Sequence, residues 1–292
     1  MGDNGGKRCV KVLVIAGGGV YGMIPSVFLK SVKSIGGVDV LGGTSVGGIL
    51  CLHLAKYGDP IRMYDDFKAN VSRIFTRSLS NVFNPFSPKY SSDGVESALQ
   101  GIFEGDVAGC PGKFVVPALN FKNVKPVIFH NFSCEYGHMD LWKIARATSA
   151  APMYFPPYSE NILIDGGILE NLPVITTAAM ACKHLGVLPC DLDVLAIGTG
   201  AIDQNTGRTN DEVSRYSRLD WARNLFPILT TGGNEMMSQL WGEHMGFNSF
   251  RYFNPVAIDG VMDNISKVDS IEDKCEIYRG QFLEVWNDFL AE

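Results

Sequence analysis

The sequence predicts an α/β fold built on a mostly parallel sheet with crossover helices, and two observations support this. Residues 10–16 (VKVLVIA) and 192–197 (LDVLAI) are continuous apolar runs, typical of strands buried on both faces of a sheet. Residues 10–33 and 38–54 each give a strand, a glycine turn and a helical pattern in that order. Repetition of this unit places neighbouring strands in parallel.

The other elements follow from apolar spacing and turn residues. Asp59-Pro60 is typical of the N-cap and first position of a helix, and Asp93 with Glu96 suggests a capping box. Further strands are expected at 114–121, 126–132, 161–164 and 248–253, and further helices at 140–150, 173–184, 218–241 and 270–289. Pro227 and Gly232-Gly233 should interrupt the long helix. Polar stretches at 78–92 and 203–216 read as loops.

Composition limits the class of protein. The 292 residues are 46% hydrophobic and show no repeat or linker, which predicts a single domain over residues 1–292 with a short flexible N-terminus, 1–8. A net charge of −6 without clustered Lys or Arg argues against nucleic-acid binding. The seven cysteines include no C-x-x-C pair, so we expect reduced thiols and no structural zinc. We see no signal peptide or membrane span and therefore expect a cytoplasmic protein.

A glycine cluster around Ser45 carries the first functional signal. Gly43-Thr44-Ser45-Val46-Gly47 fits the pattern G-x-S-x-G between a short strand and a helix. In such a nucleophile elbow the serine occupies a strained turn that points its hydroxyl out of the sheet. The N-terminus of the following helix then favours the negative charge that develops during acyl transfer.

The glycine loop at residues 17–22 (GGGVYG) has two readings. It satisfies G-x-G-x-x-G after a strand, as in dinucleotide-binding folds, but the acid that such a fold needs at the end of its second strand is missing. Asp39 lies at the beginning of that strand instead. The second reading is an oxyanion hole, in which adjacent glycine N–H groups face a tetrahedral intermediate.

An activated serine needs a base, and three residues compete for that role. His184 falls late in a predicted helix, and His244 has no loop signature. Asp165 ends a predicted strand and is followed by Gly166-Gly167, so its carboxylate could project at the edge of the sheet. A turn aspartate would look the same, and the residues alone leave this choice open.

Taken in order, these motifs resemble the patatin-like phospholipase family. GGGVYG is similar to that family's oxyanion loop, GTSVG to its elbow and DGG (165–167) to the block that contains its catalytic acid. The segments 145–157 (ARATSAAPMYFPP) and 197–200 (IGTG) also resemble family blocks, as do the stretches YFNP and MDNIS. The similarity covers nearly the whole chain.

The resemblance implies a three-layer α/β/α patatin-like fold and hydrolysis of acyl esters of phospholipids or related lipids. Carried over by position, Ser45 is the nucleophile, Asp165 is its base, and Gly18 and Gly19 with the Val20 amide form the oxyanion hole. No metal or other cofactor is implied. The family's arginine in the first block is Tyr21 here, which bears on loop positioning or substrate contact.

Lipid access needs apolar surface, and residues 83–86 (FNPF) and 152–158 (PMYFPPY) are aromatic and rich in proline. For the second stretch we favour ordinary core packing. We expect a lipid substrate, leave peripheral membrane contact open and expect no nucleic acid. Two alternatives remain: a nucleotide-binding module that uses the loop from Gly17 to Gly22, and a patatin-like protein that binds lipid without turnover.

Overall fold

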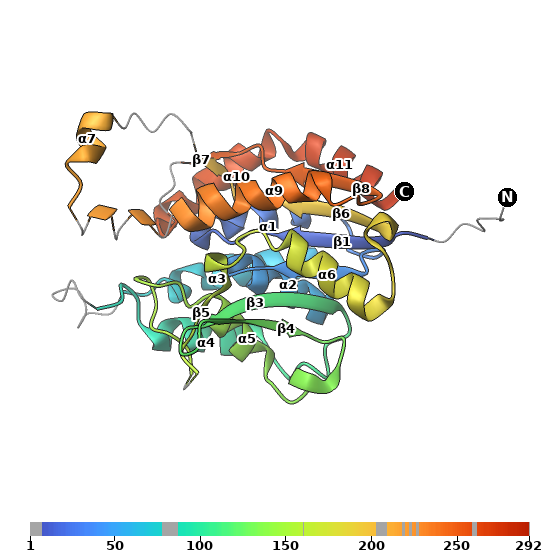
Figure 1. The fold of residues 1–292 in the computed structure, drawn as a ribbon, viewed down its shortest axis with the longest axis horizontal. Coiled ribbons are helices and arrows are strands. Elements are labelled where there is room, and N and C mark those ends of the chain that lie inside the picture. Colours follow the sequence, from blue (N-terminus) through green and yellow to red (C-terminus); the bar gives the residue numbers. More distant parts are fainter. Residues whose placement is uncertain are drawn as a thin grey trace.

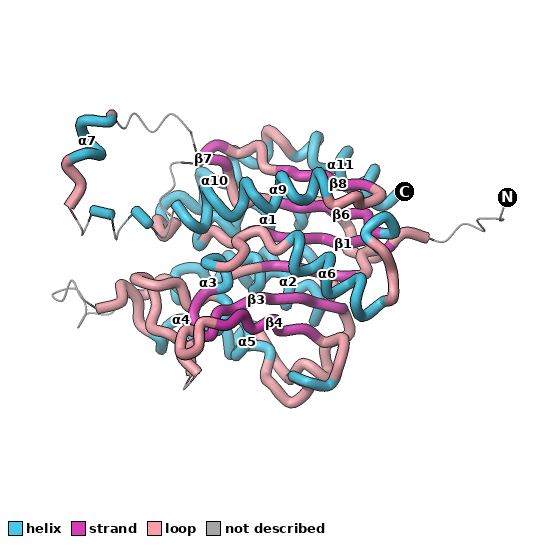
Figure 2. Tube along the Cα trace, viewed as in Figure 1, coloured by secondary structure: helices cyan, strands magenta, loops and turns pink. Residues whose placement is uncertain are grey.

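The fold comes from a computed structural model that describes residues 8–77, 87–159, 161–202, 209–217, 220–221, 224–225, 228–258 and 262–291. The stretch 83–86, which we considered for lipid contact, lies outside them, as do residues 1–7. Figure 1 shows a central sheet with helices in front of it and behind it, and Figure 2 shows the same arrangement by element type.

The sheet has seven strands in the order β4-β3-β2-β1-β6-β8, with β5 paired to β3. The pairs β1–β2, β1–β6, β2–β3 and β6–β8 are parallel, whereas β4 and β5 run antiparallel to β3. The expectation of a mostly parallel sheet is therefore confirmed. The strands are β1 (Val10–Ile15), β2 (Val40–Gly43), β3 (Lys113–Asn120), β4 (Lys125–His130), β5 (Leu163–Asp165), β6 (Leu192–Ile197) and β8 (Ser249–Phe253); β7 (Ala201–Ile202) and β9 (Ala257–Ile258) form a separate pair.

Strand β1 shows why helices pack on both faces of the sheet. Leu13 and Ile15 belong to one buried cluster, and Val12 and Val14 to another, because successive side chains point to opposite faces. The first cluster is completed by α1 (Met23–Lys30), α2 (Val46–Tyr57), α3 (Pro60–Ile74), α4 (Ser92–Ile102), α5 (Leu141–Thr148), α10 (Val268–Glu276) and α11 (Arg279–Ala291). On the other face lie α6 (Val174–Leu185) and α9 (Glu235–His244) (Figure 1).

Local signals placed most elements, and four expectations were wrong in detail. Asp59 caps α3 as expected, accepting hydrogen bonds from two backbone N–H groups. The cap of α4, however, is Ser91, while Asp93 lies in its first turn. The stretch expected as a polar loop contains a short helix, α7 (Asn210–Ser214). Residues Ile228–Asn234 form a π-helix that continues into α9 instead of a break at the glycine pair, and the final helix is divided into α10 and α11.

The carboxyl ends of the parallel strands bring three loops to one edge of the sheet, at the left in Figure 1. Residues 17–19 follow β1, Ser45 follows β2 and Thr199 follows β6. Asp165, at the end of antiparallel β5, pairs with Ala118 of β3. Within the described residues, no helix has the length and apolar content needed to cross a bilayer.

Candidate active site

Ser45 occupies a strained turn between β2 and α2. Its φ of 55° and ψ of −127° are unusual for a residue with a side chain, as expected of a nucleophile elbow. Strand and helix approach so closely that a Cβ at Gly43 would lie 2.3 Å from the Gly47 carbonyl oxygen, so glycine is required there. The Ser45 N–H donates to Thr148 Oγ1 at 3.0 Å, which fixes the turn.

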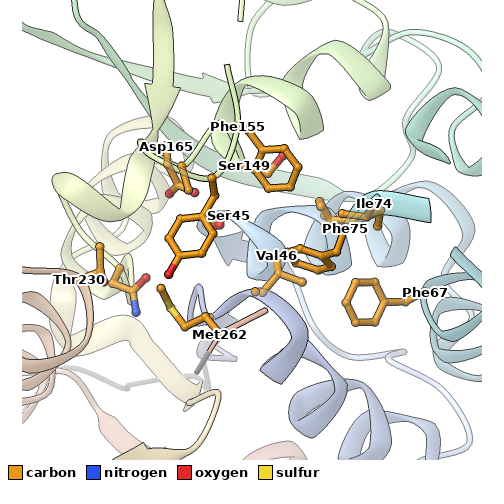
Figure 3. Close-up of a pocket in the computed structure, with 16 residues that line it drawn as sticks. Ser45, Val46, Phe67, Ile74, Phe75, Ser149, Phe155, Asp165, Thr230 and Met262 are labelled. Atoms are coloured by element: carbon orange, nitrogen blue, oxygen red, sulfur yellow. The ribbon is translucent and has the colours of Figure 1, made fainter. Parts of the chain in front are cut away.

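The Ser45 and Asp165 side chains line the same cavity, and Figure 3 shows them together. Asp165 is buried, with an exposed fraction of 1%. Burial raises the pKa of Asp165 to about 7, although the neighbouring Ser45 side chain and the hydrogen bond from the Gly167 N–H (2.7 Å) oppose the rise. A carboxylate with that pKa is a stronger base than an ordinary aspartate and is still ionised above neutral pH.

The glycine loop after β1 adjoins this pair. Gly18 and Gly19 line the same cavity as Ser45 and Asp165. The Gly17 N–H donates to the Asn171 carbonyl at 2.9 Å, and the Gly17 carbonyl accepts from Asn171 Nδ2 (3.1 Å) and Thr199 Oγ1 (2.7 Å). In the described part of the chain no acceptor engages the N–H of Gly18 or Gly19. These two amides are available to a ligand.

Val20 departs from the expectation that its amide completes the oxyanion hole. Its N–H donates to the Met262 carbonyl at 2.8 Å and is therefore occupied in this structure. Tyr21, at the position of the family arginine, is 2% exposed and packs in the core. It is absent from the cavity wall, so direct substrate contact by this residue is not supported.

An apolar cavity leads to the Ser45 hydroxyl (Figure 3). Its interior volume is about 50 Å³. Tyr154 and Phe155 line it, so the stretch for which we favoured core packing also forms cavity wall. The remaining lining is mostly apolar: Val46, Ile49, Phe67, Ile74, Phe75, Ala151 and Met262, with Ser149, Asn171 and Thr230 as polar members.

Neither histidine considered as a base reaches this cavity. His184, in α6, stacks on Phe132. His244, at the end of α9, contacts the Leu240 carbonyl. Asp39, the acid considered for a dinucleotide fold, binds Arg8 and the Lys11 N–H at the opposite end of β2 from Ser45. Among the described residues, no three His, Cys, Asp or Glu side chains gather as a metal site requires.

Sequence reasoning missed three residues that shape the site. Thr148 holds the Ser45 turn, and Asn171 and Thr199 hold the Gly17 carbonyl. Thr148 and Thr199 lie inside two of the segments that resemble family blocks, and Asn171 follows DGG by four residues, but nothing local distinguishes these three from ordinary loop residues. Only the fold brings these segments to the same sheet edge.

Comparison with known proteins agrees with this geometry. Residues 13–178 match the family described as patatin-like phospholipase. The chain is 29% identical over 261 residues to a cGAMP-activated phospholipase of Pseudomonas aeruginosa, covering 82% of this chain and 77% of that protein. It is 28% identical over 262 residues to patatin-like protein 4 of Arabidopsis thaliana, covering 74% and 65%.

A third relative is lysophospholipase NTE1 of Eremothecium gossypii, 27% identical over 199 residues, covering 66% of this chain and 12% of that protein. The family match covers more than half of the chain and includes the glycine loop, Ser45 and Asp165. This chain belongs to the patatin-like phospholipase family.

Proposed function

We propose that this chain cleaves acyl esters of phospholipids or related lipids through an acyl-Ser45 intermediate, with Asp165 as the base. The observation that carries the proposal is the placement of Ser45, in a strained turn, beside the buried Asp165 carboxylate in one apolar cavity. Family membership and the names of the phospholipase relatives support lipid acyl hydrolysis in general.

Acylation of Ser45 needs two proton transfers, the first to Asp165 and the second from Asp165 to the leaving alcohol. Ser45 Oγ attacks the ester carbonyl carbon while its proton passes to Asp165, and the carbonyl oxygen becomes an oxyanion facing the Gly18 and Gly19 N–H groups. When the tetrahedral intermediate collapses, the bond to the alcohol breaks and Asp165 returns the proton to the leaving oxygen. Water then attacks the acyl-serine by the same route and releases the fatty acid. A carboxyl pKa of about 7 suits both proton transfers near neutral pH.

The apolar lining of the cavity suits the acyl part of such a substrate. Phe67, Phe75 and Phe155 supply apolar walls to one side of Ser45 (Figure 3). Burying a hydrocarbon chain there is favourable by about 0.8 kcal/mol for each methylene group. The glycine-loop amides would meet the ester carbonyl, while the head group would remain towards the mouth.

The direct test is a panel of phospholipids and lysophospholipids assayed by mass spectrometry with wild type and Ser45→Ala. We expect wild type to release fatty acid and Ser45→Ala to release none, with an unchanged fold by circular dichroism. His184→Ala is the matched control and should retain most activity. Near wild-type hydrolysis by pure Ser45→Ala would exclude Ser45. Lipid binding without turnover by wild type would support the catalytically silent alternative.

We also propose that α9 contacts the lipid surface. Its inward face carries Glu235, Ser238 and Gly242, which are buried, whereas its outward residues Met236, Met237, Leu240 and Trp241 are 48–59% exposed. Between 228 and 241 the only charged residue is the buried Glu235. Thr230, in the π-helix that leads into α9, lines the cavity, so this apolar face begins beside the proposed substrate mouth.

The double substitution Met236→Ser/Leu240→Ser tests this contact. Hydrolysis of phosphatidylcholine in vesicles should fall about tenfold, with little change on a soluble short-chain ester, because only the vesicle assay needs surface binding. Ile277→Ser is the control, since Ile277 is equally apolar and 76% exposed but lies outside α9. An equal loss on both substrates, or dissociation of a wild-type dimer by the double substitution, would contradict a lipid contact.

A further inference from the structure

Glu235, the first residue of α9, is a buried carboxyl group that the Ser45–Asp165 chemistry does not use. It is 5% exposed and accepts hydrogen bonds from the Tyr252 hydroxyl (2.6 Å) and from Asn171 Nδ2 (3.4 Å). Asn254 Nδ2 is at 3.5 Å. Burial raises the pKa of Glu235 to about 7, and no cation of the described chain offsets this. Burying a carboxyl group without a neighbouring cation lowers the stability of the fold. We therefore look for a role of Glu235 other than stabilisation.

Asn171 connects this carboxyl to the glycine loop. Its Nδ2 donates both to Glu235 and to the Gly17 carbonyl, and its own backbone carbonyl accepts from the Gly17 N–H. Thr199 Oγ1 provides a second donor to the Gly17 carbonyl at 2.7 Å. The Gly17 carbonyl is therefore held by two side chains, and the orientation of one of them depends on Glu235.

The orientation of that carbonyl determines the direction of the next N–H. A trans peptide is planar, so its C=O and N–H groups point in opposite directions. Because the Gly17 carbonyl points at Asn171 and Thr199, the Gly18 N–H points away from them. Gly18 lines the cavity beside Ser45, and no described acceptor engages its N–H.

We propose that Glu235 is a positioning residue: it orients the Asn171 amide, which fixes the Gly17–Gly18 peptide so that the Gly18 N–H faces the oxyanion formed at Ser45. The inference rests on the proposed hydrolysis at Ser45. An oxyanion donor acts on the transition state much more than on bound ester. Loss of Glu235 should therefore lower kcat and leave KM nearly unchanged.

The experiment measures kcat and KM of Glu235→Ala and Glu235→Gln on a soluble short-chain ester. We expect Glu235→Ala to lower kcat about tenfold, which is less than the 10²–10³ for removal of a donor itself, with KM within about twofold. Glu235→Gln keeps one acceptor oxygen and should lose less. Asp193→Asn, which removes a buried carboxyl near the far end of the sheet, is the control and should lower the Tm without changing kcat.

A double-mutant cycle shows whether Glu235 acts through Asn171. In an Asn171→Ala background, Glu235→Ala should have little further effect on kcat. Three results would each overturn the proposal. The first is an unchanged kcat in folded Glu235→Ala, and the second is additive losses of kcat in the cycle. The third is an equal loss of kcat in Glu235→Ala and Asp193→Asn when the two variants have the same Tm. If Glu235→Ala does not fold, the single variants Glu235→Gln and Asn171→Ala are used instead. Full activity of both would contradict the proposal. Retained activity of Ser45→Ala would instead count against the proposed function.

Discussion

At the scale of single residues, the proposed role of Asp165 as the base leads to a prediction for the pH dependence of hydrolysis. A carboxylate base must be ionised to accept a serine proton, and burial raises the pKa of Asp165 to about 7. We therefore expect log(kcat/KM) on a soluble ester to fall with unit slope below about pH 7, where an ordinary aspartate would hold the rate down to about pH 4.

The same profile should be measured with Glu235→Gln, because Glu235 is a second buried carboxyl with a pKa of about 7. The fall below pH 7 should persist in that variant. A flat profile down to pH 5, or loss of the inflection in Glu235→Gln, would show that Asp165 is not the group that titrates.

Burial of Asp165 also carries a cost in stability. Its folded-state pKa lies above the unfolded value, so its contribution to the free energy of unfolding falls as pH rises from about 4 to about 7. Asp165→Asn, which cannot ionise, should therefore raise the Tm at pH 8 by a few degrees and give no gain at pH 4. If the difference in Tm between Asp165→Asn and wild type were smaller at pH 8 than at pH 4, this assignment would be contradicted.

At the scale of elements, the three glycines that follow β1, residues 17–19, have no room for side chains. A Cβ at Gly18 would lie 2.2 Å from Thr199 Oγ1. Gly18→Ala should displace the loop and lower kcat by about 10²–10³ with a smaller change in KM, because a transition-state donor is lost. Gly101→Ala in α4 is the control, since nothing lies within 4 Å of its Cβ position.

This substitution also distinguishes the nucleotide-binding alternative. A ligand that binds only the folded state raises the Tm. We expect no rise with millimolar NAD or ATP. A saturable rise that Gly18→Ala abolishes would identify the loop as a nucleotide site and overturn its proposed role as an oxyanion hole.

The parts of this site that depend on neighbouring residues could be predicted from the sequence, whereas the parts that depend on contacts between distant segments could not. The elbow at Ser45 and the turn after Asp165 could be predicted because each depends on a few neighbouring residues. The contact between Val20 N–H and the Met262 carbonyl could not, since it joins opposite ends of the chain. Glu235 was also missed: a helix with polar residues inward and apolar residues outward reverses the pattern by which buried faces are recognised.

At the scale of the whole molecule, a buried ion pair joins β1 to β6 away from the catalytic edge. Lys11 Nζ lies 2.9 Å from Asp193 Oδ2, and both side chains are buried. Burial alone would raise the pKa of Asp193, but hydrogen bonds from Asn248, Lys11 and Ser249 outweigh it and hold that pKa below its ordinary value. The stabilisation is thus present above the unfolded pKa and lost as pH falls below it.

Asp193→Asn should lower the free energy of unfolding by about 3 kcal/mol at pH 7, because it leaves the Lys11 charge buried without a partner. Urea unfolding at pH 7 and pH 3 measures this, and the difference from wild type should shrink at pH 3. An equal difference at both values would mean that the ion pair does not account for the loss.

The central claim, that Ser45 is the nucleophile and Asp165 its base, is tested most directly by mapping a fluorophosphonate adduct by peptide mass spectrometry at pH 8. The reagent phosphonylates an activated serine. We predict one adduct, on the peptide containing GTSVG at Ser45, with no label in Ser45→Ala and much slower labelling in Asp165→Asn. An adduct on another residue, or equal labelling rates in wild type and Asp165→Asn, would contradict the account.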